Sequence, residues 1–129
     1  MKSPASWTTI IHHRNTLTRH PDVLEAYQDF KLQLAAKGKS LEDNIREKVI
    51  KGAHGPILTP NQFPYWTETG IEHWVLWSPH GPLSPAEIRD AITAQRPSWV
   101  RRVFWFENLP AVKTVPGIWH VQVFLRAHL

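Results

Sequence analysis

The stretch GIWHVQVFLR, residues 117–126, decides the fold because its residues alternate between two kinds of side chain. Alternation with a period of two is typical of a strand that presents two sets of side chains to opposite faces of a sheet. The apolar set is Trp119, Val121, Val123 and Leu125, and the mixed set is Ile118, His120, Gln122 and Phe124. We therefore predict a strand with one dry face. The pair His120 and Gln122 on the other face suits a polar site better than a core.

Two further long strands and a helix are expected upstream of this stretch. Residues 70–79, GIEHWVLWSP, alternate with Ile71, His73, Val75 and Trp77 on one face, and residues 99–108, WVRRVFWFEN, form the next strand. Between them, Ser84 suits a helix N-cap, Pro85 suits the first helical position and Glu87 completes a capping box. The last two strands should pair antiparallel, because the connection between them is short.

The first half of the chain predicts helices. One helix should begin at Pro21 and stop before Gly38, and a second should begin after Ser40 and end at Gly52. The next stretch is rich in proline and is expected to be loop, with one short strand near residues 56–59. The prediction is a single α+β domain over residues 1–129: a helical part, 1–52, and a strand–helix–strand–strand core, 53–129. We expect a small antiparallel sheet with the helices packed on one side of it.

Composition narrows the functional classes. The 129 residues include no cysteine, and no apolar run approaches the roughly 20 residues of a membrane-spanning helix. We therefore expect an intracellular, cytoplasmic protein with no membrane association. The net charge is +4, but the basic residues are spread out and nucleic acid is an unlikely partner. The seven tryptophans are expected mainly in the core. A homodimer is one of the assemblies that the sequence allows.

The eight histidines fall into three groups. Those near the termini are expected to be surface imidazoles, while His54 and His80, in glycine–proline loops, fit either the surface or the rim of a site. His73 and His120 lie in the middle of predicted strands, where a buried imidazole needs a hydrogen-bond partner. Either a carbonyl satisfies each ring, or the mixed face is the floor of a ligand site. No histidine spacing marks a metal site, and we expect no metal and no cofactor.

The segments around these strands resemble the mainly fungal family called N-acetylglucosamine-induced proteins. That family's pattern has an Asn-x-[Phe/Trp]-Pro-Tyr stretch, then Ile-x-His-x-Val-x-Trp, and later hydrophobic-Trp-Phe-x-Asn, Lys-[Ser/Thr]-Val and His-Val. The residues that fit it in order are Asn61, Phe63, Pro64, Tyr65, Ile71, His73, Val75, Trp77, Trp105, Phe106, Asn108, Lys113, Thr114, Val115, His120 and Val121. The match covers about residues 57–125. The family often has a second histidine two residues before the last one, and here that residue is Ile118.

A more distant resemblance is to the histidine triad superfamily. Its galactose-1-phosphate uridylyltransferase and dinucleotide-polyphosphate phosphorylase branches end in His-x-His-x-Gln, where the middle histidine attacks the α-phosphorus and the glutamine holds the phosphate. Here Ile118-Trp119-His120-Val121-Gln122 keeps the middle histidine and the glutamine and lacks the first histidine. The resemblance implies a nucleophilic His120 and nucleotide-facing positions at Asn61, His73 and Asn108. It also implies a histidine-triad-like fold.

Together these observations predict that the mixed face binds a nucleotide, a nucleotide sugar or a sugar phosphate. His120 is the expected catalytic residue, in nucleotidyl or phosphoryl transfer through a phosphoramidate. The expected ligand-binding residues are Gln122, His73, Asn61, Asn108, Trp77, Lys113 and Tyr65. Two alternatives stay open: a non-catalytic sensor for the same ligands, and a protein-interaction module linked to amino-sugar metabolism. Ile118 favours binding, and Gln122 favours transfer.

Overall fold

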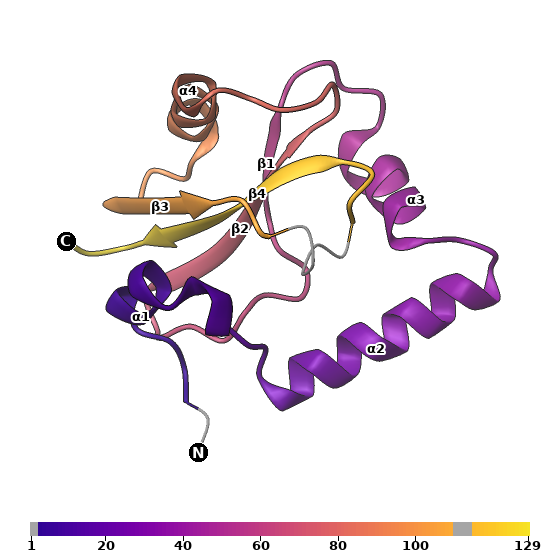
Figure 1. Ribbon diagram of the computed structural model, residues 1–129, viewed down its shortest axis with the longest axis horizontal. Coiled ribbons are helices and arrows are strands. Elements are labelled where there is room, and N and C mark those ends of the chain that lie inside the picture. Colours follow the sequence, from indigo (N-terminus) through magenta and orange to yellow (C-terminus); the bar gives the residue numbers. More distant parts are fainter. Residues whose placement is uncertain (1–2, 110–114) are drawn as a thin grey trace.

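A four-stranded antiparallel sheet lies at the centre of the molecule, with its strands in the order β1-β2-β4-β3 (Figure 1). The structure is a computed structural model and describes residues 3–109 and 115–129. The strands are β1 (Ile57–Pro60), β2 (Ile71–Ser78), β3 (Arg102–Phe106) and β4 (Trp119–Arg126). The helices are α1 (Trp7–His12), α2 (Pro21–Ala36), α3 (Leu41–Ile45) and α4 (Pro85–Gln95), with a 3-10 turn η1 (Arg14–Thr16) and a π-helical turn η2 (Arg46–Ile50). This arrangement confirms the α+β class.

Strand β4 pairs antiparallel with both β2 and β3, as predicted for the last two strands. In the register with β2, Trp77 lies opposite His120 and Val75 lies opposite Gln122. Residues that lie opposite each other in an antiparallel pair share a face of the sheet. The mixed residues of β4 therefore lie on the same face as His73 and Trp77.

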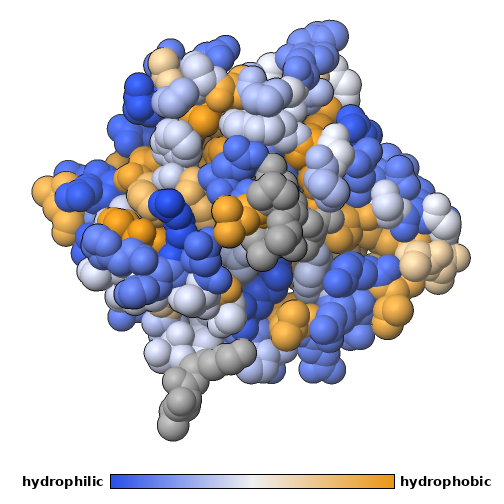
Figure 2. Space-filling model, viewed as in Figure 1, coloured by the Kyte–Doolittle hydropathy of each residue, from blue (hydrophilic) through white to orange (hydrophobic). Residues whose placement is uncertain are grey.

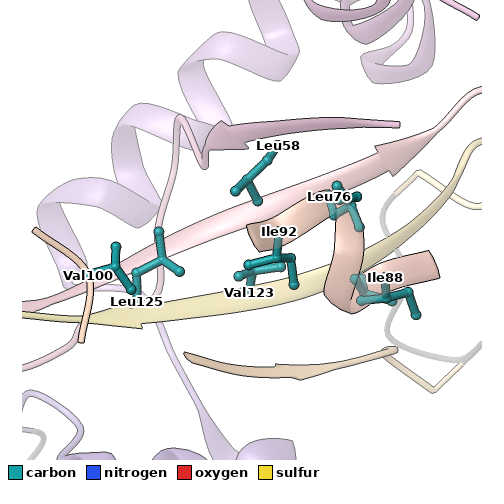
Figure 3. Close-up of a cluster of buried hydrophobic side chains, with 9 residues drawn as sticks. Leu58, Leu76, Ile88, Ile92, Val100, Val123 and Leu125 are labelled. Carbon is teal, nitrogen blue, oxygen red and sulfur yellow. The ribbon is translucent and has the colours of Figure 1, made fainter. Parts of the chain in front are cut away.

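The other face of the sheet is dry and is covered by α4 (Figure 3). Ser84 caps this helix in the predicted capping box with Glu87. The helix packs Ile88 and Ile92 onto the apolar residues of the strands. The buried members of this cluster are Leu58, Leu76, Ile88, Ala91, Ile92, Val100, Val121, Val123 and Leu125. The apolar half of the alternating pattern thus forms the main core, as the sequence predicted.

The mixed face is covered by helices as well, so the expectation of helices on one side only is wrong. At one end, α3 and η2 pack on Val75 and Trp77, with Ile50 buried between them. At the other end, Ile10 of α1 packs on Phe106 and Phe124. The physical reason is that β2 and β4 are apolar at both ends of the mixed face, and this surface also has to be removed from water.

The N-terminal segment is more ordered than its sequence suggests. Helix α1 was not predicted, because six residues are too few to show a helical period, yet Ser6 caps it by accepting the Thr9 amide. Helix α2 begins at Pro21 as predicted, and His20 caps it by accepting the Asp22 amide at Nδ1. His20 is therefore a capping residue, and its side chain is still 39% exposed at the surface.

Helix α2 extends along one edge of the molecule (Figure 1) and buries only Tyr27 and Leu34 among its sixteen residues. The next helix begins after Ser40 as predicted, in a capping box with Asp43. Its last turn is π-helical, closed by a hydrogen bond from the Lys51 amide to the Arg46 carbonyl. Gly117 lies against this helix, and a Cβ at that position would overlap the Glu42 carboxylate.

Candidate functional site

A cavity of about 480 Å³ lies over the middle of the mixed face, between the two apolar clusters at its ends. Its volume falls within the range of small-molecule sites, roughly 300–1,000 Å³. Seven of the eight residues expected to form the site line it: Asn61, Tyr65, His73, Trp77, Asn108, His120 and Gln122. The eighth, Lys113, lies outside the described residues. The structure therefore brings all the described members of the predicted set to one cavity.

A chain of hydrogen bonds fixes the protonation of His73. Its Nδ1 accepts the backbone N–H of Tyr65 at 3.0 Å, so the proton of the neutral ring must be on Nε2. That Nε2–H then donates to Oε1 of Gln122 at 2.5 Å. The ring is also stacked between Tyr65 and Phe124, at centroid distances of 4.8 and 4.7 Å. His73 is thus held in one tautomer and one orientation.

His73 stays neutral over the physiological range. The pKa of His73 is lowered from 6.5 to about 3, mainly by burial; the hydrogen bond to Gln122 opposes this shift, and the charge of Arg19 adds to it. His73 is therefore not a general base or acid near pH 7. Its part in the site is to hold Gln122.

The hydrogen bond to His73 also fixes the orientation of the Gln122 side-chain amide. Because its oxygen accepts from His73, the amide NH₂ is left as the donor end of the side chain. This NH₂ makes no hydrogen bond with another described residue, and it is not among the buried polar atoms that lack a partner. It therefore reaches the cavity, where it can donate to an anionic oxygen.

His120 is buried beside Gln122 and is also held in one tautomer. Its Nδ1 donates to the carbonyl of Ile118 at 2.8 Å, since a carbonyl oxygen can only accept. In the neutral ring the lone pair is then on Nε2, the nitrogen that a nucleophilic imidazole uses. The indole of Trp77 packs against the ring at a centroid distance of 4.6 Å. The Ile118 side chain, where a histidine often stands in the family pattern, is buried in the apolar cluster under α3 and η2.

The cavity has a positive electrostatic character. Two cationic side chains, Arg19 and Lys48, lie on its wall, and no carboxylate lies among the described residues that line it. Arg19 uses Nε to donate to the Phe63 carbonyl at 2.8 Å, and neither cation is in an ion pair within the described part of the chain. An unpaired positive wall over buried polar groups favours an anionic ligand.

An aromatic group forms another part of the wall. Phe63, from the loop after β1, packs against Tyr27 and Phe30 of α2 at centroid distances of 5.1 and 5.2 Å. The loop itself is held by Asn61, whose side-chain oxygen accepts the Phe63 amide. These rings offer an apolar surface on which a planar or sugar-like group can lie.

Sequence reasoning missed the residues that α2, α3 and the segment before α2 bring to the cavity. Arg19 follows an irregular stretch, and Asn44 and Lys48 are on the exposed-looking side of an amphipathic helix. The spacing of Asn44 and Lys48, four residues apart, was the available signal, because it places both on one helix face. Nothing in the local sequence of Arg19 marks its role.

The remaining histidines of interest lie elsewhere. His54 and His80 are exposed and stack on each other at 6.1 Å, and neither lines the cavity, so both are surface residues. Within residues 3–109 and 115–129, no group of three or more His, Cys, Asp or Glu side chains is placed to hold a metal ion. No helix in this part of the chain is long and apolar enough to cross a membrane.

Fold and site together define a small α+β protein that carries a ligand-sized, positively charged cavity on one face of an open antiparallel sheet. Residues 6–126 match the family described as protein of unknown function (DUF3605), and the chain belongs to this family. The description gives no activity.

Two known proteins are similar to the chain. The uncharacterized protein YPL067C of Saccharomyces cerevisiae is 28% identical over 100 residues, which cover 64% of this chain and 50% of the yeast protein. The chain thus spans about half the length of this relative. The crystal structure of HTC1 matches with a TM-score of 0.64 at 24% identity, covering 94% of this chain and 84% of that one, and supports the fold.

Proposed function

We propose that the protein binds a small phosphate-bearing molecule, a nucleotide, nucleotide sugar or sugar phosphate, in the cavity on the mixed face. The observation that carries the proposal is the orientation of Gln122. His73 takes up its oxygen, and its NH₂ donors are directed to a cavity that holds two unpaired cations and no described carboxylate. Amide N–H groups and cations without a competing carboxylate are the groups that bind phosphate oxygens.

The two ends of the cavity suit different parts of such a ligand. The phosphate would lie near Gln122 and His120, with Lys48 and Arg19 balancing its charge. The base or sugar would lie against the aromatic wall of Tyr27, Phe30 and Phe63. The resemblance to N-acetylglucosamine-induced proteins supports amino-sugar phosphates and their nucleotide conjugates as the first ligands to test.

A second candidate function, nucleotidyl transfer, is favoured by the hydrogen bond of His120. In this reaction Nε2 forms a bond to the α-phosphorus while the bond to the leaving phosphate oxygen breaks, and the leaving group departs as an anion without a proton. The Nδ1–H bond to the Ile118 carbonyl would stabilise the positive charge that develops on the ring. Water or a second phosphate then attacks the phosphorus, and the N–P bond breaks.

Docking of a protein partner has less support from the described surface. The exposed large apolar side chains are few: Leu24 and Leu32 on α2, and Trp99, Leu109 and Leu129 outside the helices and strands. On the face shown in Figure 2, hydrophilic residues divide the apolar ones into several patches. A docking surface would be expected to show one large continuous patch.

Calorimetric titration tests the binding proposal. Uridine monophosphate, glucosamine 6-phosphate and UDP-N-acetylglucosamine would be titrated into the protein and into His120→Ala, with His80→Ala as a matched control on the surface. We expect saturable binding of at least one ligand by the protein and by His80→Ala, and a loss of about tenfold or more in His120→Ala. Absence of binding by all three ligands, or equal effects of both substitutions, would contradict the proposal.

Transfer is tested separately with a UDP-sugar radiolabelled at the phosphorus attached to uridine. A phosphoramidate is stable in base and labile in acid. We expect a labelled adduct with these properties in the protein and none in His120→Ala. Binding without any adduct would leave the protein as a non-catalytic binder.

A further inference from the structure

A second cavity, of about 290 Å³, shares part of its wall with the first. Arg19, Tyr65 and Asn108 border both cavities. The other walls come from the segment between α1 and α2 and from the first turns of α2, namely Arg14, Asn15, Leu17, Thr18 and Leu24. Of the residues expected to form the first site, His73, His120 and Gln122 do not border this second space.

The polar groups of the second cavity have few partners in the protein. Its two cations, Arg14 and Arg19, form no ion pair with a described carboxylate, and no carboxylate lies among the described residues that line it. The side chains of Asn15, Thr18 and Asn108 form no hydrogen bond within the described part of the chain. Donors without an internal partner around a small space suit an anionic group of a ligand.

Both arginines of the second cavity contact aromatic rings. The guanidinium of Arg19 lies over Tyr65 at 5.3 Å, and that of Arg14 lies over Phe106 at 5.7 Å. Tyr65, His73, Phe124 and Phe106 form one continuous stack, with successive centroid distances of 4.8, 4.7 and 5.8 Å. Each of the two cations thus contacts one of the two outer rings of this stack.

We infer that the second cavity is a subsite for a second anionic group, and that the ligand carries two such groups, one on each side of Arg19. This inference rests on the proposed function and narrows it from phosphate-bearing molecules in general to molecules with two phosphates or a phosphate and another anion. Two kinds of molecule provide this chemistry. In nucleoside diphosphates the groups are adjacent, and in hexose bisphosphates a sugar ring separates them.

Matched pairs of ligands test the inference. Affinities would be measured calorimetrically for uridine monophosphate against uridine diphosphate, and for glucose 6-phosphate against glucose 1,6-bisphosphate. We expect the second phosphate to raise affinity about tenfold in one of the two pairs, as a charge-assisted contact does. The pair that shows the gain identifies the spacing of the two groups.

Variants show which residue produces the gain in affinity from the second phosphate. Arg14→Gln should remove the advantage of the second phosphate and leave the affinity for the monophosphate unchanged, whereas Lys48→Gln should weaken both members of a pair equally. Arg89→Gln, an exposed position on α4, makes the same change in net charge on the far face and should alter neither affinity. Equal melting temperatures of the variants would show that the fold is intact.

The outcomes separate this inference from the proposed function. If a monophosphate binds through His120 but the second phosphate adds nothing, or its gain survives Arg14→Gln, the second subsite is wrong and the first stands. If neither pair binds at all, both are wrong. If Arg14→Gln lowers the affinity for the monophosphate as much as that for the diphosphate, Arg14 acts through long-range electrostatic attraction and no second subsite exists.

Discussion

The two faces of the sheet are made by the same strands and are both buried, yet they carry different kinds of side chain. On the dry face Leu76 and Val123 are fully buried against α4. On the mixed face His73, His120 and Gln122 are only 3, 4 and 6% exposed, but they lie beside an open cavity. Because neighbouring residues of a strand point to opposite faces, a single alternating segment separates the residues that stabilise the fold from those expected to bind.

The mixed face shows how a small domain can tolerate buried polar groups. On the mixed face the imidazoles are satisfied by groups that are fixed in place: the Tyr65 amide, the Ile118 carbonyl and the Gln122 amide oxygen. Both ring nitrogens of His73 are used in these bonds, whereas the Gln122 amide keeps its NH₂ group for the cavity. Substitutions on the dry face should therefore change folding, and those on the mixed face should change binding.

The largest effect of a single substitution at neutral pH is expected from a cavity on the dry face. Leu76→Ala should lower the free energy of unfolding by about 3 kcal/mol, because a fully buried leucine loses both its burial and its packing contacts. Urea unfolding measures this loss, and ligand affinity of the folded protein should not change. Leu32→Ala, at a position on α2 that is 71% exposed, is the control and should have little effect. Equal losses in the two variants would remove the distinction between core and surface.

Acid is expected to lower the stability of the fold through His73 on the mixed face. The pKa of His73 is about 3 in the folded protein and 6.5 when unperturbed, so below pH 6.5 the unfolded chain binds a proton that the folded protein does not. The His73 contribution is constant above pH 6.5 and falls by about 1.4 kcal/mol per pH unit from there down to pH 3. His73→Gln should flatten this part of the stability profile, measured by urea unfolding between pH 4 and pH 7. An identical slope in the variant would show that other groups cause the acid destabilisation; the exposed His80→Gln should keep the slope.

Gln122→Glu should separate binding from stability most sharply. The glutamate keeps an oxygen that accepts from His73 Nε2–H, so the fold should persist, but a carboxylate replaces the NH₂ donor in the cavity. We expect affinity for uridine monophosphate to fall at least about tenfold, or about 1.4 kcal/mol. The new negative charge should also raise the pKa of His73 and reduce its acid-dependent loss of stability. Unchanged affinity would place the phosphate away from Gln122.

The smallest effects are expected from the two capping serines. Ser84→Ala and Ser40→Ala each remove a capping box and should each lower the free energy of unfolding by about 1 kcal/mol. Only Ser40→Ala should also weaken ligand binding, because its helix carries Asn44 and leads into Lys48 at the cavity. Thermal unfolding and calorimetry on the same samples check both parts. A loss of binding in Ser84→Ala would contradict the separation of the two faces.

Much of the sheet could be predicted because its signals are local. Alternation assigned His120 and Gln122 to one face of their strand by parity alone, and the capping box placed the start of α4. The register between β2 and β4 then follows from burying the apolar set on one side. This is why the strand-borne part of the candidate site could be named from the sequence.

The rest of the site depends on tertiary packing, which has no local signature. Arg19 reaches the cavity because its guanidinium lies over Tyr27 and donates to the Phe63 carbonyl, forty-four residues away in the chain. Lys48 reaches it because α3 packs on the mixed face, a placement that the one-sided arrangement we predicted excluded. The short helix α1 could not be predicted, because most of its stabilisation comes from burying Ile10 against distant strands.

The π-helical turn η2 makes the cavity wall sensitive to chain length. The bond from the Lys51 amide to the Arg46 carbonyl spans five residues, so this turn holds one residue more than an α-helical turn. Deleting one residue here would restore α-helical spacing and rotate the downstream residues by about 100° around the helix axis. Ile50 would leave the apolar cluster that it shares with Trp77. Replacing Glu47 by alanine would remove an exposed ion pair to Lys39. Deleting Glu47 would instead rotate the residues that follow it and so change the side chains that form the cavity wall.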